Sequence, residues 1–233
     1  MTRFATTRWS LFLDARDPGT SRRALEEICR AYHAPVLAYV RGHGYSQSDA
    51  EDLTQEFFAR FLEGRWDTGV DPHRGHFRAF LLVAVRRFLI SSDVAAHTLK
   101  RGGGTLQLNG DQELEQIEAP EGDSPEQAFH RAWALAVLER SFARLREETA
   151  RAGKSQLFEQ LSPYLGERPA TDEYQRMSEE LGLRSNTIAV AVHRLRARLR
   201  ELVREELADT CGGPAGVEAE LHALRDTLRH LDG

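Results

Sequence analysis

Cysteines, long apolar runs and strand patterns are all scarce in this sequence of 233 residues. The two cysteines, Cys29 and Cys211, are far apart and have no companion at metal-binding or redox spacing, which favours a reducing compartment. No apolar run approaches the roughly 20 residues that a membrane-spanning helix needs. The first residues also lack the charged-then-apolar order of a secretion signal. We therefore expect a cytoplasmic protein that has no membrane contact.

Charge is unevenly distributed along the chain. Hydrophobic residues make up 41% and charged residues 29% of the sequence, which suits one or two globular domains rather than a disordered chain. The net charge of −5 by itself argues against a nucleic-acid partner, but the distribution of charge matters more than its sum. The segment 111–126 holds seven acids and no Lys or Arg, whereas 194–200 holds four arginines and no acid. Such segregation indicates that different segments serve different partners.

Apolar residues recur at helical spacing, and no segment alternates apolar and polar residues between turn signals. The pattern predicts an all-α fold with two helical domains joined by an irregular acidic linker. The expected helices cover 7–15, 21–41, 49–63 and 76–92, then 124–150, 155–161, 171–181, 186–207 and 217–231. The expected divisions are an N-terminal domain (1–98), a linker (99–123), a C-terminal domain (124–209) and an amphipathic extension (210–233).

Short local signals mark several of these boundaries. Ser48 followed by Glu51 predicts a capping box at the start of the helix over 49–63. Ser124, with Pro125 and Gln127 behind it, predicts the start of the C-terminal half. Three consecutive glycines at 102–104 interrupt the periodicity and indicate the linker.

The segment 172–207 predicts a helix-turn-helix, in which the second helix reads DNA. Gly182 can adopt the left-handed conformation that ends the first helix, and Ser185 is expected to cap the second. The second helix turns one apolar stripe toward the core and a polar face away from it. The stripe holds Ile188, Val192, Leu195, Leu199 and Leu202, and the outer face holds Asn186, Val190, His193 and Ala197.

Arginines flank this outer face on both sides and suit a phosphate backbone: Arg194, Arg196, Arg198 and Arg200. We expect them to hold phosphates while Ser185, Asn186 and Thr187 in the first turn face base edges. Val190 and His193 complete the predicted DNA-contact set. The alternative is a solvated helix whose arginines serve solubility, because short helix-turn-helix patterns also arise by chance.

Two segments resemble the same family. Residues 49–58 (DAEDLTQEFF) resemble the signature of the first conserved domain of extracytoplasmic-function sigma factors, and residues 181–196 resemble the helix-turn-helix of their second domain. Three further segments are similar to one branch of that family: 6–10 (TTRWS), 77–82 (FRAFLL) and 100–104 (KRGGG). The resemblance covers about residues 6–208 in the family's order, and the tail after Thr210 resembles an extension of that branch.

The resemblance implies a sigma factor, which binds core RNA polymerase and directs promoter recognition and transcription initiation. The first domain of such factors contacts the clamp helices of the largest polymerase subunit and captures the minus-ten promoter element. Their second domain reads the minus-thirty-five element and contacts the flap of the second-largest subunit. An anti-sigma factor or another regulator is a further partner that the resemblance suggests, and it implies no cofactor.

The helix expected at 49–63 suits the polymerase contact. Its apolar side holds Leu53, Phe57, Phe58, Phe61 and Leu62. The other side holds Asp49, Asp52, Gln55 and Glu56, which together are too acidic for DNA and suit a basic protein surface. An ordinary solvated helix face is the alternative.

The helix expected at 76–92 supplies the aromatic rings and cations that single-stranded DNA binding uses. The predicted minus-ten contacts are Phe77, Arg78, Phe80, Arg86 and Arg87, together with Lys100 and Arg101 further on. The rings also sit at core spacing, so burial is the alternative for them. The sequence departs from many relatives here, because residues 90–99 contain no Lys or Arg.

No motif indicates an enzyme, because a nucleophile elbow and a phosphate-binding glycine loop are both missing from the sequence. His73 and His76 have no cysteine partner and no helical metal-binding spacing, so we expect no metal ion. Two other interpretations stay open. One is a free-standing helix-turn-helix regulator that binds an operator without polymerase, and the other is a protein-interaction module of a signalling pathway.

Overall fold

The computed structural model describes residues 18–63, 77–100, 124–166, 171–208, 211 and 214–229. The side chains of 18–25, 93–100, 171–172, 174–175 and 214 lie outside this description. The predictions for the helix at 7–15, for His73 and His76, for Arg101 and for the linker after Lys100 therefore fall outside the described residues.

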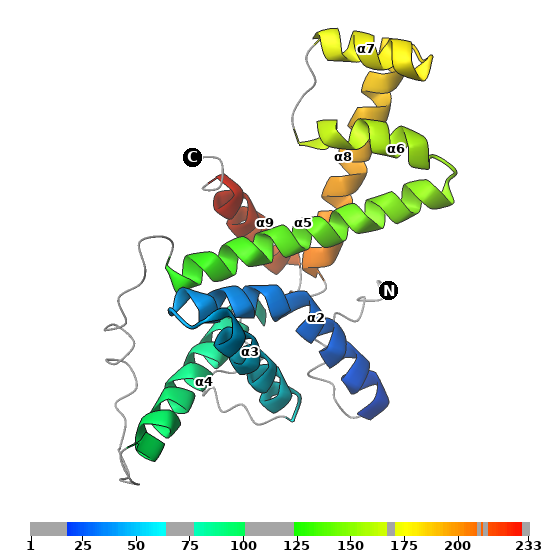
Figure 1. Cartoon of the computed structure of the whole chain (residues 1–233). Helices are drawn as coiled ribbons and strands as arrows, with labels where there is room; N and C mark the ends of the chain where they lie inside the picture. Colours follow the sequence, from blue (N-terminus) through cyan, green and yellow to red (C-terminus); the bar gives the residue numbers. More distant parts are fainter. Residues whose placement is uncertain are drawn as a thin grey trace. The chain divides into compact units, whose positions relative to one another are not determined.

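The described residues form helices and short connections, and none of them belongs to a strand, so the all-α prediction is confirmed (Figure 1). The elements, with the labels of Figure 1, are α2 (Pro18–Gly42), α3 (Gln47–Leu62), α4 (Phe77–Lys100), α5 (Pro125–Arg151), α6 (Ser155–Leu161), the 3-10 turn η2 (Ser162–Leu165), α7 (Thr171–Leu181), α8 (Ser185–Ala208) and α9 (Pro214–Arg229).

The start of α3 differs from the sequence prediction. Ser46, whose backbone is extended (φ −59°, ψ 162°), is the N-cap, and its Oγ accepts a hydrogen bond from the N–H of Asp49 at 3.2 Å. The predicted cap, Ser48, lies inside the helix, and its helical backbone rules out the cap position. The capping box predicted from Ser48 and Glu51 is therefore wrong by two residues.

The other predicted capping box is confirmed at the start of α5. The N–H of Gln127 donates to Oγ of Ser124 at 3.2 Å, and the N–H of Ser124 donates to Oε1 of Gln127 at 2.8 Å. The end of α4 differs, because the helix continues past Ser92 to Lys100. The first strong helix breaker after Ser92 is Gly102, which explains the longer helix.

The chain divides into two compact units. The first contains residues 1–136 and 208–233, and the second contains residues 137–207. The first part of α5 and the whole of α9 therefore group with the N-terminal helices, whereas the sequence pattern placed them in the C-terminal domain and in a separate extension. Each unit is described by itself below.

Aromatic rings form the core of the first unit. Phe57 of α3 packs edge-on against Phe88 of α4, with ring centroids 5.6 Å apart. Phe61 of α3 and Tyr32 of α2 both meet Phe77 of α4, at 6.4 Å and 4.9 Å, also edge-on. All five rings are buried, and edge-to-face pairs of this kind add to the burial energy. The α2, α3 and α4 helices thereby form one bundle.

The start of α5 packs closely against α2 in the same unit. The ring of Phe129 meets that of Tyr39 at 6.5 Å with an interplanar angle of 90°. A Cβ atom on Gly42 would lie only 2.8 Å from Cα of Pro125, so the close approach of the two helices requires glycine at this position. Trp133, one turn beyond Phe129, is also fully buried.

Two apolar clusters hold the second unit together. In one, Leu145 of α5 and Leu202 of α8 enclose Phe158 of α6. In the other, Leu161, Met177, Ile188 and Val192 join α6, α7 and α8. Ile188, Val192 and Leu202 belong to the apolar stripe predicted for α8, and all three are buried as expected.

Candidate nucleic-acid and partner-binding surfaces

The α7 and α8 helices meet at a tight turn. Gly182 has a φ of +64°, the left-handed conformation that its position predicts. Oγ of Ser178 donates to the carbonyl oxygen of Leu183 at 2.6 Å and ties the turn to α7. Met177 and Ile188 are buried in the core that the two helices share with α6. This is the geometry of a helix-turn-helix.

The first turn of α8 differs from the sequence prediction in one detail, the residue that precedes the helix. The carbonyl oxygen of Arg184 accepts from the N–H groups of Thr187 and Ile188, at 2.8 Å and 3.2 Å. Arg184 is thus the residue that flanks the helix, and Ser185, predicted to be the cap, is the first helical residue. The side chain of Ser185 is half-buried, whereas those of Asn186 and Thr187 are exposed.

The outer face of α8 is exposed along several turns. Val190, 42% exposed, is one of the few large apolar side chains on the described surface. His193, Arg194 and Arg200 are exposed as well. Within the described residues, neither Arg194 nor Arg200 takes part in an ion pair. Their guanidinium groups are therefore available to an external anion.

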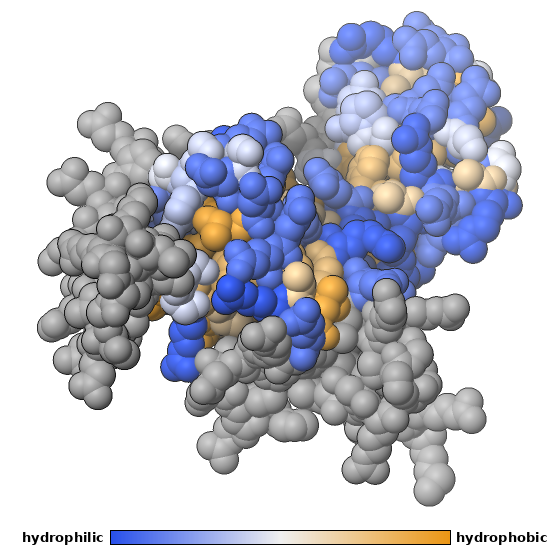
Figure 2. Space-filling model, turned by 60° about the horizontal axis from the view of Figure 1, so that its bottom comes forward, coloured by the Kyte–Doolittle hydropathy of each residue, from blue (hydrophilic) through white to orange (hydrophobic). Residues whose placement is uncertain are grey.

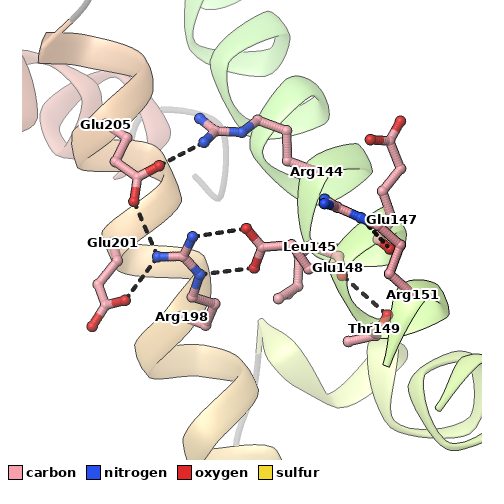
Figure 3. A network of polar contacts seen from close by, with 9 residues as sticks. All are labelled: Arg144, Leu145, Glu147, Glu148, Thr149, Arg151, Arg198, Glu201 and Glu205. Carbon is pink, nitrogen blue, oxygen red and sulfur yellow. Dashed lines mark hydrogen bonds and ion pairs between the residues drawn. The ribbon is translucent and has the colours of Figure 1, made fainter. Parts of the chain in front are cut away.

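Unlike Arg194 and Arg200, Arg198 pairs with carboxylates of its own unit (Figure 3). Its Nε and Nη2 donate to the two carboxylate oxygens of Glu148 on α5, at 2.8 Å and 2.7 Å. Its Nη1 donates to Glu201 at 2.9 Å and to Glu205 at 3.0 Å. Arg144 of α5 pairs with the other oxygen of Glu205. The network links α5 to α8 and leaves Arg198 surrounded by carboxylates.

The charges within this network shift one another's titration. The hydrogen bonds from Arg198 lower the pKa of Glu148 below its ordinary value, because they favour the ionised carboxylate. In turn Glu148, and after it Glu201, raise the pKa of Arg198. In this conformation Arg198 cannot contact a DNA phosphate without breaking these bonds.

Arg196 is also engaged inside the unit. Its Nη2 donates to the carbonyl oxygen of Tyr164 at 2.7 Å, and its side chain is half-buried. The four arginines predicted to hold phosphates therefore separate into two groups. Arg196 and Arg198 fix the packing of α8, while Arg194 and Arg200 face outward.

An exposed arginine that the sequence analysis passed over flanks the same surface. Arg184 lies in the turn directly before α8, and its side chain is exposed. Its position at the N-terminus of the predicted recognition helix, where backbone N–H groups also favour anions, was the signal that could have identified it.

The polar face of α3 is exposed as predicted. The side chains of Asp49, Asp52, Gln55 and Glu56 are all exposed. Asp49 also accepts a hydrogen bond from Oγ of Ser46 at 2.7 Å, and Glu56 forms an ion pair with Arg60 one turn away. Asp52 and Gln55 lie between these local pairs on an open helix surface.

An apolar groove runs beside this acidic face. It lies between α2 and α3, measures about 660 Å³, and includes Phe58, His33 and Gln55 in its lining. Leu62, which the spacing placed on the buried side of the helix, is 42% exposed and lines the groove instead. Cys29 also borders it, and burial raises the pKa of this thiol to about 11, so the thiol stays protonated. On the face shown in Figure 2 the described surface is mainly hydrophilic, with a few such apolar patches.

The predicted minus-ten residues of α4 differ in how far their side chains are exposed. Phe77 and Phe80 are buried, at 1% and 4% exposure, so in this conformation neither ring can stack on a base. Arg86 and Arg87 are exposed, and Arg78 is mostly buried. Only the backbone of Lys100 is described.

Residues 28–92 match a family model, that of sigma-70 region 2. The matched segment covers α3 and most of α2 and α4, the bundle that carries the exposed acidic face. It includes residues 49–58, on which part of the resemblance rests, and the match supports the sigma-70 family for this segment. No curated protein and no solved structure matches the chain.

None of the helices in the described residues combines the length and the hydropathy needed to cross a bilayer. The same residues bring no three His, Cys, Asp or Glu side chains together in a way that could hold a metal ion.

Proposed function

We propose that this chain is a sigma factor of the extracytoplasmic-function class that carries a C-terminal extension. The match of residues 28–92 to sigma-70 region 2 is the observation that carries the proposal. The helix-turn-helix of α7 and α8 supports it, because a polymerase-binding bundle and a DNA-reading element then occur in one chain. The role requires no catalytic residue and no cofactor.

In this proposal the acidic face of α3 binds polymerase. Asp49, Asp52, Gln55 and Glu56 present carboxylates and an amide on one exposed surface. A basic partner surface is their natural complement, since opposite potentials steer association and fix register. We assign that partner to the clamp helices of the largest polymerase subunit. The α2–α3 groove next to this face offers apolar contact area to the same partner.

The α8 helix enters the major groove of the minus-thirty-five element in this proposal. Asn186 and Thr187 lie at its exposed N-terminal turn, where base edges come within reach. Arg194 and Arg200 hold phosphates on either side, with Arg184 at the turn as a third cation. The second unit also contacts the flap of the second-largest subunit.

The cations of α4 serve the minus-ten element. Arg86 and Arg87 are exposed on this helix and can attract the single strand that forms on melting. Lys100 and Arg101 extend the cationic set toward the linker. Contacts from Phe77 and Phe80 would require a change in the packing of the first unit, because both rings are buried.

The direct test is association of the intact protein with bacterial core RNA polymerase. Reversing two charges, D52K with E56K, should weaken association by more than about tenfold, because like charges across an interface cost several kcal/mol. The matched control reverses Glu139 and Glu147, two exposed carboxylates of α5, and should leave association unchanged. Circular dichroism checks that each variant folds.

The outcome separates the sigma-factor proposal from the free-standing regulator. Loss of association in the α3 variant alone supports the sigma-factor proposal. Equal association of both variants with polymerase would contradict the role of α3. Failure of the wild-type chain to associate, combined with tight binding to duplex DNA by itself, would instead identify a free-standing regulator.

A further inference from the structure

Arg78, at the start of α4, is enclosed by side chains from two other helices of the first unit. Its Nε and Nη2 donate to Oε2 and Oε1 of Glu220 on α9, at 2.9 Å and 3.1 Å. Its Nη1 lies 2.6 Å from Nδ1 of His130 on α5. The guanidinium carbon lies 4.3 Å from the centroid of the Trp133 ring, also on α5. All four residues belong to one compact unit.

These contacts engage all three nitrogens of the guanidinium and one of its faces. The fork of Nε and Nη2 is paired with a carboxylate, Nη1 is hydrogen-bonded, and one face is stacked on an indole ring. Since arginine only donates, Nδ1 of His130 must accept, so the imidazole is neutral. Burial, and next the charge of Arg78, lower the pKa of His130, which agrees with this assignment.

The ion pair is well shielded from solvent. The side chain of Glu220 is 4% exposed and that of Arg78 is 15% exposed. In contrast, Arg86 and Arg87 on the same helix are exposed. Glu220 is one of the two acids that are buried in the described residues, and its charge is compensated by Arg78. The contact thus depends on both members of the pair, because each alone would be an uncompensated buried charge.

The chemistry beneath Glu220 is that of a phosphate contact. Single-stranded nucleic acids bind where cations hold the phosphates, and Arg78 supplies such a cation. The carboxylate of Glu220 pairs with the guanidinium in the two-bond geometry that a phosphate also adopts. Glu220 therefore occupies the position at which a phosphate oxygen would bind Arg78.

We propose that α9 is an internal cover that competes with single-stranded nucleic acid for Arg78. With α9 in place, Glu220 neutralises the arginine. When α9 moves away, the cation becomes a contact for the backbone of a single strand. This inference rests on the proposed function, in which α4 faces the melted promoter.

The α9 helix is buried along one side only, which suits a cover that opens. Leu221 and Leu224 are its buried leucines, next to Glu220 on the same side of the helix. Other side chains of α9 are exposed, among them Asp226 and Arg229, which form an ion pair with each other. A charge change at Glu220 should therefore shift the equilibrium of the cover without unfolding the α2–α4 bundle.

The test uses the full chain with E220R, which places a like charge against Arg78. The matched control is D226R, which changes the net charge equally on the exposed side of α9. Binding of a fluorescein-labelled oligodeoxythymidine is measured by fluorescence anisotropy. We expect E220R to bind about tenfold more tightly than D226R, about the size of one hydrogen-bonded contact to a charged group. Adding R78Q to E220R should remove the gain.

Hydrogen exchange of residues 214–229 reports whether the cover opens, and E220Q with its control D226N repeats the comparison if E220R does not fold. Faster exchange together with the tighter binding supports the proposal. Oligonucleotide affinity equal to that of the matched control overturns it, whether or not exchange becomes faster. The same variants are assayed for association with core polymerase, which depends on α3. Failure of the wild-type chain there would contradict the proposed function independently of the cover.

Discussion

Replacing Arg198 with glutamine should destabilise the second unit without removing a DNA contact. The substitution breaks the two-bond pair with Glu148 and the contacts with Glu201 and Glu205. The side chains of Arg198 and Glu148 are about a third exposed, at 35% and 31%, so solvent screens the pair. Because of this screening, we expect the free energy of unfolding to fall by only about 1 kcal/mol. For a unit of this size it corresponds to a fall of about 4–8 °C in melting temperature.

Thermal unfolding followed by circular dichroism measures this loss, and R200Q on the same helix is the control. Because Arg200 is exposed, R200Q should change the free energy of unfolding by no more than about 0.5 kcal/mol. The salt dependence of DNA binding by the polymerase complex gives the complementary result. Each phosphate contact that is lost should lower the slope by about 1, as expected for R194Q and R200Q but not for R198Q.

The reasoning would be refuted by the opposite pattern. If R198Q lowers the salt slope by as much as R194Q while its melting temperature stays at the wild-type value, then Arg198 faces DNA. The intramolecular network would then not be the one that operates in solution.

Two further predictions concern single residues. The lowered pKa of His130 means that folding opposes its protonation, so the first unit should lose stability as the pH falls below about 6.5, the ordinary pKa of histidine. H130Q should flatten this part of the stability profile in denaturant titrations, and an unchanged profile would show that His130 is not buried against Arg78, Glu126 and Glu220. Separately, Gly182→Ala should lower the free energy of unfolding by about 1 kcal/mol, because Gly182 has a left-handed backbone. Gly166 has a φ of −74°, so Gly166→Ala should change this free energy little. Equal effects of the two substitutions in denaturant titrations would argue against the observed turn.

Features set by neighbouring residues could be predicted from the sequence. The turn at Gly182 and the capping box at Ser124 depend on a few adjacent positions, so their chemistry is visible in the sequence. The helices of the second unit follow the apolar spacing closely for the same reason. At α3 the same kind of signal was ambiguous, because Ser46 and Ser48 both precede acidic residues. Only the backbone conformation shows which of them is the cap.

Features set by distant residues could not be predicted. Helical spacing places Arg198 correctly beside the outer face of α8, but its main partner, Glu148, is fifty residues away. The partner of Arg78 on α9 is 142 residues away. No periodicity within one helix specifies such pairs. The arginines available to DNA could therefore not be separated from the structural arginines before the packing of α5 and α9 was known.

Exposure divides the predicted site residues. Asp52 and Arg194, on polar helix faces, are exposed, as are Arg86 and Arg87 of α4. Phe80 and Arg78, a ring and a cation that suit DNA, are buried or paired. Aromatic side chains satisfy a helical core as readily as a binding site, and the sequence alone does not separate the two uses.

Mapping of transcription start sites with purified bacterial core RNA polymerase tests the central claim most directly. The intact chain should direct initiation at discrete sites on genomic DNA fragments, and the D52K and E56K double variant should not. Random initiation at the level of core enzyme alone, from a chain that is folded and binds duplex DNA by itself, would contradict the sigma-factor assignment.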